Sequence, residues 1–279
     1  MIIAVISCGS IGQRHISNFV KFGFRVIGFN RSNVRSKYVE KKFKIKVFSN
    51  LKHVIDQRPD LAIICSPNSM HLEHAILFAK NKINIFIEKP LCALNQNTSR
   101  LSYLIKKYKL FNHVGCNLRF NKGIKILKKI LDENQIGDII NAEFFTGMYL
   151  PDWHPYENYK KMYSSKKKLG GGVLMDMTHE LDLATWFFGD LKKTTSILKK
   201  SPYLKTETTN VANIIVEFKN KTTVYFNLNY FEKPYRREIK IFGSNGKVSL
   251  DLIKCNLQLF YGNKKITKNY RVNYNHNKM

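Results

Sequence analysis

The feature that most constrains the fold is the alternation of short apolar runs with amphipathic stretches over the first 120 residues. Alternation of this kind is typical of parallel βαβ units, whose strands are buried on both faces. The pattern predicts strands at 2–7, 25–29, 45–48, 61–65, 84–88 and 112–116, and helices at about 10–22, 70–81 and 93–109. We therefore expect an α/β chain that begins with a doubly wound parallel sheet, covered by helices on both faces.

The pattern changes near residue 120. A helix near 121–133, a strand near 139–148, an aromatic and basic loop at 149–168 and a helical stretch near 171–188 are predicted there. From about residue 193 apolar and polar residues alternate. Two sets of apolar residues at every second position, here called apolar ranks, are Val224, Phe226, Leu228 and Tyr230, and Ala212, Ile214, Val216 and Phe218. Such alternation indicates an antiparallel sheet with one packed and one open face. We expect two domains, 1–119 and 120–279, the second being α+β with an open, mostly antiparallel sheet.

Composition excludes several classes of protein. With 44% hydrophobic and 24% charged residues, the chain is neither a disordered tail nor collagen-like. No stretch reaches the ~18 consecutive apolar residues of a membrane helix. Residues 1–6 are predicted as a first strand rather than a signal peptide. The five cysteines form no CxxC pair, so we expect free thiols in a reducing cytoplasm.

The chain is strongly basic, with 47 Lys and Arg residues against 20 Asp and Glu and a formal net charge of +27. The basic residues are scattered over the whole chain, without an RNA-binding signature or a dense arginine stripe. The resulting field attracts anions, so it suits an acidic or nucleotide-linked sugar. We expect a small-molecule substrate of this kind, no nucleic-acid partner and no membrane partner.

A glycine-rich turn, Ser7-Cys8-Gly9-Ser10-Ile11-Gly12, follows the first predicted strand. In a dinucleotide-binding fold this turn is tight, presents bare backbone to the pyrophosphate and packs the helix closely on the strand. Gly9 and Gly12 occupy the second and third glycine positions, and Ser7 occupies the first. The N-terminus of the following helix attracts the pyrophosphate. The turn predicts a dinucleotide site, and an ordinary glycine-rich turn is the alternative.

The second strand ends in Asn30-Arg31-Ser32, eighteen residues past Gly12. An acidic residue there would bind the ribose hydroxyls of NAD. Asn30 removes that charge, while Arg31 and Ser32 could hold a 2′-phosphate. The segment favours NADP over NAD as the cofactor, and a solvated turn is the alternative.

Two further segments follow the fourth and fifth predicted strands: Cys65-Ser66-Pro67-Asn68-Ser69-Met70-His71 and Glu88-Lys89-Pro90. Ligands bind at the carboxyl ends of parallel strands in such sheets. Lys89 is therefore a candidate for gripping cofactor hydroxyls and polarising a substrate oxygen. Pro90 restricts the backbone of Lys89 to extended geometry and so fixes its direction. The alternative for Lys89 is an ordinary surface lysine.

A third segment contains three glycines at 170–172, followed by Asp176 and His179. The glycines let backbone approach closely, either to a partner element or to a ligand. On one helix Asp176 and His179 would share a face. A histidine beside a carboxylate can serve as general base, and a buried, structurally satisfied histidine is the alternative. No third ligand stands at a suitable spacing and His154 is isolated, so no metal is expected.

These motifs occur in the order found in the Gfo/Idh/MocA oxidoreductases, and the chain resembles that family, the relatives of glucose–fructose oxidoreductase and inositol dehydrogenase. The motifs are Ser7-x-Gly9-x-x-Gly12, Ser66-Pro67-Asn68 with His71, Glu88-Lys89-Pro90 and Gly170-Gly171-Gly172-x-x-x-Asp176. The segment Tyr149-Leu150-Pro151-Asp152-Trp153, with the basic loop after it, is similar to members associated with bacterial surface-sugar biosynthesis.

The resemblance implies an N-terminal Rossmann domain, a C-terminal domain with a large sheet, NAD or NADP as cofactor, and a sugar, cyclitol or sugar nucleotide as substrate. It also implies a homo-oligomer, a dimer or tetramer, formed through the open face of the sheet. Catalysis would rest on Lys89, Asp176 and His179. The cofactor would contact Ser7, Gly9, Ser10, Ile11, Gly12, Asn30, Arg31, Ser32, Ser66, Pro67, Asn68, His71, Glu88 and Lys89.

The expected reaction is hydride transfer between nicotinamide and a secondary hydroxyl or keto carbon. His179 would exchange the proton, Lys89 would stabilise the developing charge on oxygen, and Asp176 would position the substrate or His179. Further candidates for the substrate pocket, each equally able to serve packing, are Asn117, Arg119, Trp153, His154 and Tyr163.

Other function classes stay open. A non-catalytic nucleotide or sugar sensor of the same fold would have no need of both Lys89 and His179. A nucleic-acid-binding protein is supported by the net charge alone. Within enzymology, a lyase or glycosidase cycle could reduce bound NAD transiently.

Overall fold

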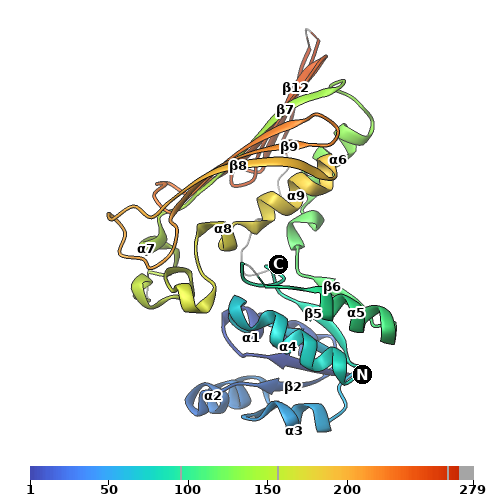
Figure 1. Cartoon of the computed structure of the whole chain (residues 1–279), viewed down its shortest axis with the longest axis vertical. Helices are drawn as coiled ribbons and strands as arrows, with labels where there is room; N and C mark the ends of the chain where they lie inside the picture. The colour runs from blue at the N-terminus through green and yellow to red at the C-terminus, as the bar shows by residue number, and fades with distance from the viewer. Residues whose placement is uncertain (95, 156, 263, 270–279) are drawn as a thin grey trace. The chain divides into compact units, whose positions relative to one another are not determined.

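The computed structural model describes residues 1–94, 96–155, 157–262 and 264–269. The chain divides into two compact units, the first covering residues 1–115 and the second beginning at Cys116 (Figure 1). Each unit has its own sheet and its own hydrophobic core.

The first unit is built on a six-stranded, all-parallel sheet in the order β3-β2-β1-β4-β5-β6. The strands are β1 (Ile2–Ile6), β2 (Arg25–Phe29), β3 (Lys46–Phe48), β4 (Leu61–Ile64), β5 (Asn84–Ile87) and β6 (Asn112–Val114). The middle strands β1 and β4 are almost wholly apolar and buried, as strands covered on both faces must be. The predicted doubly wound sheet is confirmed.

Five helices cover the two faces of this sheet: α1 (Ser10–Lys21), α2 (Asn33–Phe43), α3 (Leu51–Asp56), α4 (Asn68–Lys80) and α5 (Ser99–Tyr108). One core packs α1 and α2 on the sheet through residues such as Ile16 and Val39. The other packs α3, α4 and α5 through residues such as Val54, Phe78 and Leu104. The strands therefore end at one edge with helices on both faces, the arrangement in which ligands bind beyond the carboxyl ends.

Three helical features differ from the sequence prediction. Helices α2 and α3 were not predicted, because α2 buries only Ser36 and Val39 and α3 has little more than one turn. Helix α5 begins at Ser99 and not near residue 93. The side chain of Asn97 accepts a hydrogen bond from the backbone N–H of Ser99 at 2.8 Å, which favours a helix start at that point.

The second unit begins with a 3-10 turn, η1 (Asn117–Phe120), and helix α6 (Lys122–Asp132). The loop predicted at 149–168 forms α7 (Leu150–Trp153) and three single turns, η2 (Tyr159–Lys161), η3 (Tyr163–Ser165) and η4 (Lys167–Leu169). Helices α8 (Val173–Asp176) and α9 (Thr178–Phe188) follow. The strands are β7 (Ile139–Gly147), β8 (Leu191–Lys199), β9 (Val211–Phe218), β10 (Thr223–Asn229), β11 (Arg236–Gly243), β12 (Gly246–Asp251), β13 (Asn256–Tyr261) and β14 (Lys264–Asn269).

These strands form one eight-stranded sheet in the order β14-β13-β12-β11-β7-β10-β9-β8. Every neighbouring pair is antiparallel except β10 and β7, which run parallel. Both predicted apolar ranks are buried, and α6 and α9 lie along that side of the sheet (Figure 1). On the opposite face Ile215 and Tyr225, cross-strand neighbours, are almost half exposed. The predicted open, mostly antiparallel sheet is confirmed.

The helical stretch predicted near 171–188 is present as two helices, α8 and α9, with a break at Met177. The hydroxyl of Thr178 donates to the carbonyl of Met175 at 3.2 Å, a local bond that competes with continuation of the helix. Asp176 is therefore the last residue of one helix and His179 the second residue of the next. The expectation that they share the face of one helix does not hold.

Candidate functional site

The glycine-rich turn at the end of β1 depends on two backbone features. Ser7 has a φ of +80°, the left-handed conformation that favours glycine, and its N–H donates to the carbonyl of Phe29 at 2.9 Å. A Cβ added to Gly12 would lie 2.1 Å from the carbonyl oxygen of Ser7. Serine therefore occupies the first glycine position at a cost in backbone strain, and Gly12 is required by the close packing of α1 on the turn.

Gly9 has a different environment. A Cβ built on it would meet no atom nearer than the guanidinium of Arg35, at 3.9 Å. Gly9 is the N-cap residue of α1 and carries no side chain to cap the helix, so the first backbone N–H groups, those of Ser10 and Ile11 included, are open to an anion. Bare backbone at the N-terminus of a twelve-residue helix fits the pyrophosphate of a dinucleotide.

The segment 30–32 serves the turn itself. The buried side chain of Asn30 accepts a hydrogen bond from the N–H of Cys8 at 3.3 Å and donates to the carbonyl of Ser32 at 3.1 Å. The hydroxyl of Ser32 caps α2 by accepting from the N–H of Arg35. Arg31 is exposed, and Arg35, which the sequence prediction did not include, lies on the same side of the turn as Gly9.

His71 connects the two motif segments that follow β4 and β5. Its ring is buried, with Nδ1 2.7 Å from the carbonyl oxygen of Pro90 and Nε2 2.7 Å from that of Ser66. Burial lowers the pKa of His71, against the opposing effect of these two carbonyl groups. The His71 side chain thus connects the segment after β4 to the segment after β5. Asn68 is buried at the start of the same helix, α4.

His74, one turn further along α4, contacts the segment after β4 through Ser66. Its Nδ1 lies 3.0 Å from the hydroxyl of Ser66, and its ring packs edge-on against Phe29. Burial lowers the pKa of His74 to about 4, so the ring is neutral at physiological pH.

The lowered pKa of His74 predicts a loss of stability in acid. Because the unfolded chain takes up this proton near the ordinary pKa of 6.5, the free energy of unfolding should fall as the pH drops from about 6.5 to about 4. The contribution of one such group is ~3 kcal/mol. In His74→Gln this part of the loss should disappear, as measured by urea unfolding at pH 7, 5.5 and 4. Equal acid sensitivity in both proteins would contradict the assignment.

Glu88 is engaged by the first helix. Its Oε1 lies 2.7 Å from Nε2 of His15 on α1, and the His15 ring packs edge-on against Phe86. The carboxylate predicted to touch cofactor thus has a partner within the protein, and it ties the end of β5 to α1. Lys89, the next residue, is half-buried. Within the first unit the structure therefore brings together the segments 7–12, 30–32, 66–71 and 88–90.

In the second unit the glycines at 170–172 pack against protein backbone. A Cβ on Gly171 would lie 2.0 Å from the carbonyl oxygen of Tyr163 and 2.7 Å from that of Ser164. Gly172 has a φ of +122°, outside the range of other residues. Of the two alternatives, close approach to a partner element is the one observed. The turn fixes the start of α8 and hence the position of Asp176.

The carboxylate of Asp176 is buried and accepts a hydrogen bond from the hydroxyl of Tyr230, with 2.5 Å between the Tyr230 oxygen and Oδ2. His179, at the start of α9, is half-buried. Sequence reasoning did not select Tyr230 as a site residue. The available signal was its place at the end of a buried rank, since a buried tyrosine hydroxyl needs a polar partner.

The remaining pocket candidates have contacts of their own. Arg119 makes a bidentate ion pair with Asp182, at 2.8 Å from Nε and 2.6 Å from Nη2, and its guanidinium lies over the ring of Trp186. This geometry gives Arg119 a role in joining η1 to α9. Trp153 stacks on His154 with ring centroids 5.6 Å apart, Tyr163 begins η3, and Asn117 begins η1.

Three findings concern other kinds of site. Among the described residues, no group of three or more His, Cys, Asp or Glu side chains is arranged to hold a metal ion. No helix in the described part of the chain is long and apolar enough to cross a membrane. Among the described residues no disulfide joins any of the five cysteines, and burial raises the pKa of Cys8 to about 12, which leaves that thiol protonated in the glycine-rich turn.

Comparison with known proteins adds relatives of both units. The chain is 27% identical over 265 residues to a myo-inositol 2-dehydrogenase of Thermotoga maritima, a match that covers 91% of this chain and 76% of the relative. It is 30% identical over 154 residues to a levoglucosan dehydrogenase of Pseudarthrobacter phenanthrenivorans, covering 54% of this chain and 38% of that protein.

Solved structures share the fold. A levoglucosan dehydrogenase in complex with NADH superposes with a TM-score of 0.85 at 18% identity, covering 97% of this chain and 79% of that one. The WlbA dehydrogenase from Bordetella pertussis, in complex with NADH and UDP-GlcNAcA, gives a TM-score of 0.80 at 18% identity, covering 90% and 77%.

Family models match both parts of the chain. Residues 1–116 match the model of an oxidoreductase family with an NAD-binding Rossmann fold, and residues 124–249 match the Gfo/Idh/MocA C-terminal domain. The predicted resemblance is confirmed: the chain belongs to the Gfo/Idh/MocA oxidoreductase family.

Proposed function

We propose that this protein is an NAD(P)-dependent oxidoreductase that acts on a secondary hydroxyl or keto carbon of a sugar, cyclitol or sugar nucleotide. The observation that carries the proposal is the bare N-terminus of α1 at Gly9, with three motif segments tied around it by His15, His71 and Asn30. The named relatives are dehydrogenases of a cyclitol and a sugar, which supports the substrate class.

The cofactor contacts belong to the first unit. The N–H groups at the start of α1 would hold the pyrophosphate. Beyond β2 there is no carboxylate at 30–32 for ribose hydroxyls, and the exposed Arg31 and Arg35 add positive charge there. A 2′-phosphate would find charge-assisted donors in these two guanidinium groups. We therefore favour NADP, although the neighbouring structures named above hold NADH.

Bound nicotinamide would supply the hydride acceptor or donor. Within the chain, His179 would take the proton from the substrate hydroxyl, or return it in the reducing direction. The ammonium of Lys89 would stabilise the negative charge that develops on that oxygen. Asp176, anchored by Tyr230, would orient the substrate or His179. Lys89 belongs to the first unit, and Asp176 and His179 belong to the second.

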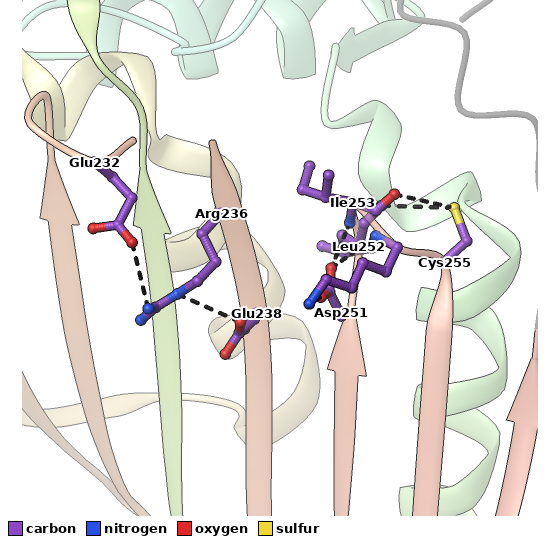
Figure 2. Close-up of polar contacts among 8 residues, drawn as sticks. Glu232, Arg236, Glu238, Asp251, Leu252, Ile253 and Cys255 are labelled. Atoms are coloured by element: carbon purple, nitrogen blue, oxygen red, sulfur yellow. Dashed lines mark hydrogen bonds and ion pairs between the residues drawn. The ribbon is translucent and has the colours of Figure 1, made fainter. Parts of the chain in front are cut away.

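The open face of the eight-stranded sheet is the surface through which we propose that copies associate into a dimer or tetramer. The exposed Ile215 and Tyr225 lie on β9 and β10, and on β11 the guanidinium of Arg236 lies 3.7 Å from the centroid of the Phe145 ring. Figure 2 shows Arg236 between Glu232 and Glu238, each 3.4 Å away. Such a mixed apolar and charged face suits a self-complementary interface. Tyr225→Lys should lower the mass measured by light scattering to that of one chain. We place the protein in the cytoplasm, because its sequence has no CxxC pair and the described residues form no disulfide.

Turnover tests the proposed function. Purified protein would be incubated with NADP⁺ or NAD⁺ and, separately, myo-inositol, levoglucosan, glucose 6-phosphate and UDP-GlcNAcA, and absorbance of the reduced nicotinamide would be followed. Formation of reduced cofactor with one of them, lost in His179→Ala, supports the proposal. Cofactor binding with no reduction or oxidation on a wider sugar panel would instead favour a sensor.

A further inference from the structure

Tyr230 is an unusual member of the core. Its side chain is fully buried directly after β10, in the same cluster as Phe226 and Leu228, yet it carries a polar hydroxyl. That hydroxyl donates to Oδ2 of Asp176 at 2.5 Å, within the range of charge-assisted hydrogen bonds. Two buried polar groups from distant parts of the sequence therefore satisfy each other.

The direction of this hydrogen bond is fixed by its surroundings. Burial and the neighbouring Asp176 carboxylate raise the pKa of Tyr230 well above its usual value, so the phenol keeps its proton and acts as donor. A charge on Tyr163 would raise the pKa of Tyr230 further, and a hydrogen bond with the side chain of Ser164 lowers it.

The backbone around the pair leaves it little freedom. Asp176 ends α8, whose start is fixed by the contact of Gly171 with the carbonyl groups of Tyr163 and Ser164. The N–H of Val173 donates to the carbonyl of Thr209 at 2.9 Å, and Tyr230 N–H donates to Asn210 at 3.0 Å. Both partners of the hydrogen bond are thus anchored through neighbouring residues, 209 and 210.

We propose that Tyr230 is a positioning residue that holds the Asp176 carboxylate in one orientation. The inference rests on the proposed function only in that Asp176 belongs to the substrate site. Removing the hydroxyl would leave the buried carboxylate without this donor, so its orientation would be less well defined.

A double-mutant cycle provides a test that needs no substrate. Tyr230→Phe should lower the free energy of unfolding measured in urea, because the buried Asp176 carboxylate loses this donor. In the background Asp176→Ala, where the acceptor is absent, the same change should cause a smaller loss or none. Tyr203→Phe is the matched control, because the Tyr203 side chain is exposed, and it should unfold like wild type. An equal loss from Tyr230→Phe in both backgrounds would show that the phenol ring only packs, and it would overturn the proposal.

Kinetics give a second test once a substrate is known. Tyr230→Phe should lower kcat by ~10-fold and change KM little, because a carboxylate that is not held in place misorients the reacting groups. In Asp176→Ala it should have no further effect on kcat. An unchanged kcat in Tyr230→Phe would overturn the proposal, whereas failure of the wild type to turn over any sugar would count against the proposed function and leave the stability test decisive.

Discussion

Lys89→Ala is expected to lower kcat by ~10²–10³ while the first unit keeps its fold. The reason is that a single ammonium group is assigned the charge that develops on the substrate oxygen, and alanine provides no donor there. The measurement is steady-state turnover of the best substrate from the screen, together with cofactor affinity and urea unfolding of the same preparation.

Lys80→Ala is the control for loss of one positive charge, because Lys80 is exposed at the end of α4. This variant should turn over like wild type. Turnover of Lys89→Ala within a factor of about three of wild type would remove Lys89 from the mechanism.

The second large effect concerns the two glycines of the turn: replacing Gly12 should lower stability, and replacing Gly9 should lower cofactor affinity. Gly12→Ala drives a Cβ to 2.1 Å from a backbone oxygen that cannot move without moving β1, so we expect a loss of ~3 kcal/mol or more in the free energy of unfolding. Gly9→Ala meets open space, so its stability should match wild type. Its Cβ would instead stand where the pyrophosphate approaches, and cofactor affinity should fall by ~10-fold or more.

Urea unfolding and a nicotinamide titration, applied to both variants, separate these two roles. Gly12→Ala should have a lower free energy of unfolding than wild type, whereas Gly9→Ala should differ from wild type only in its weaker cofactor binding. Wild-type cofactor affinity in Gly9→Ala would mean that the backbone at Gly9 is not the pyrophosphate site. Wild-type stability in Gly12→Ala would contradict the close packing of α1 on Ser7.

The sequence predicted most of the fold because apolar residues recur at regular spacing in the strands that form the hydrophobic core. Strand β1 and the apolar positions that end in Tyr230 are examples, since every residue of β1 after Ile2 and each of Val224, Phe226, Leu228 and Tyr230 is buried. Prediction failed where local contacts decide the backbone. The side chain of Asn97 favours a late start of α5, and the Thr178 hydroxyl separates α8 from α9. The spacing of hydrophobic residues does not predict single hydrogen bonds of this kind.

The sequence predicted the motifs of the candidate site, but it did not predict the hydrogen bonds and ion pairs that the motif residues make with the rest of the protein. The sequence indicated Glu88, His71 and Asn30, and it could not show that each binds another part of the protein: His15, the carbonyl of Pro90 and the N–H of Cys8. The sequence also offered Arg119 as a substrate ligand, and the structure pairs it with Asp182. Contacts between residues distant in sequence need the tertiary fold, because spacing along the chain carries no trace of them.

The most direct test of the central claim is a titration of the purified protein with NADPH and with NADH, followed by nicotinamide fluorescence. The account predicts saturable binding of at least one of them, weakened ~10-fold or more in Gly9→Ala, with NADPH the tighter ligand because of Arg31 and Arg35. Tighter binding of NADH would correct the cofactor preference and keep the function. Binding of neither, with no nicotinamide released on denaturation, would contradict the assignment of this protein as a nicotinamide-dependent oxidoreductase.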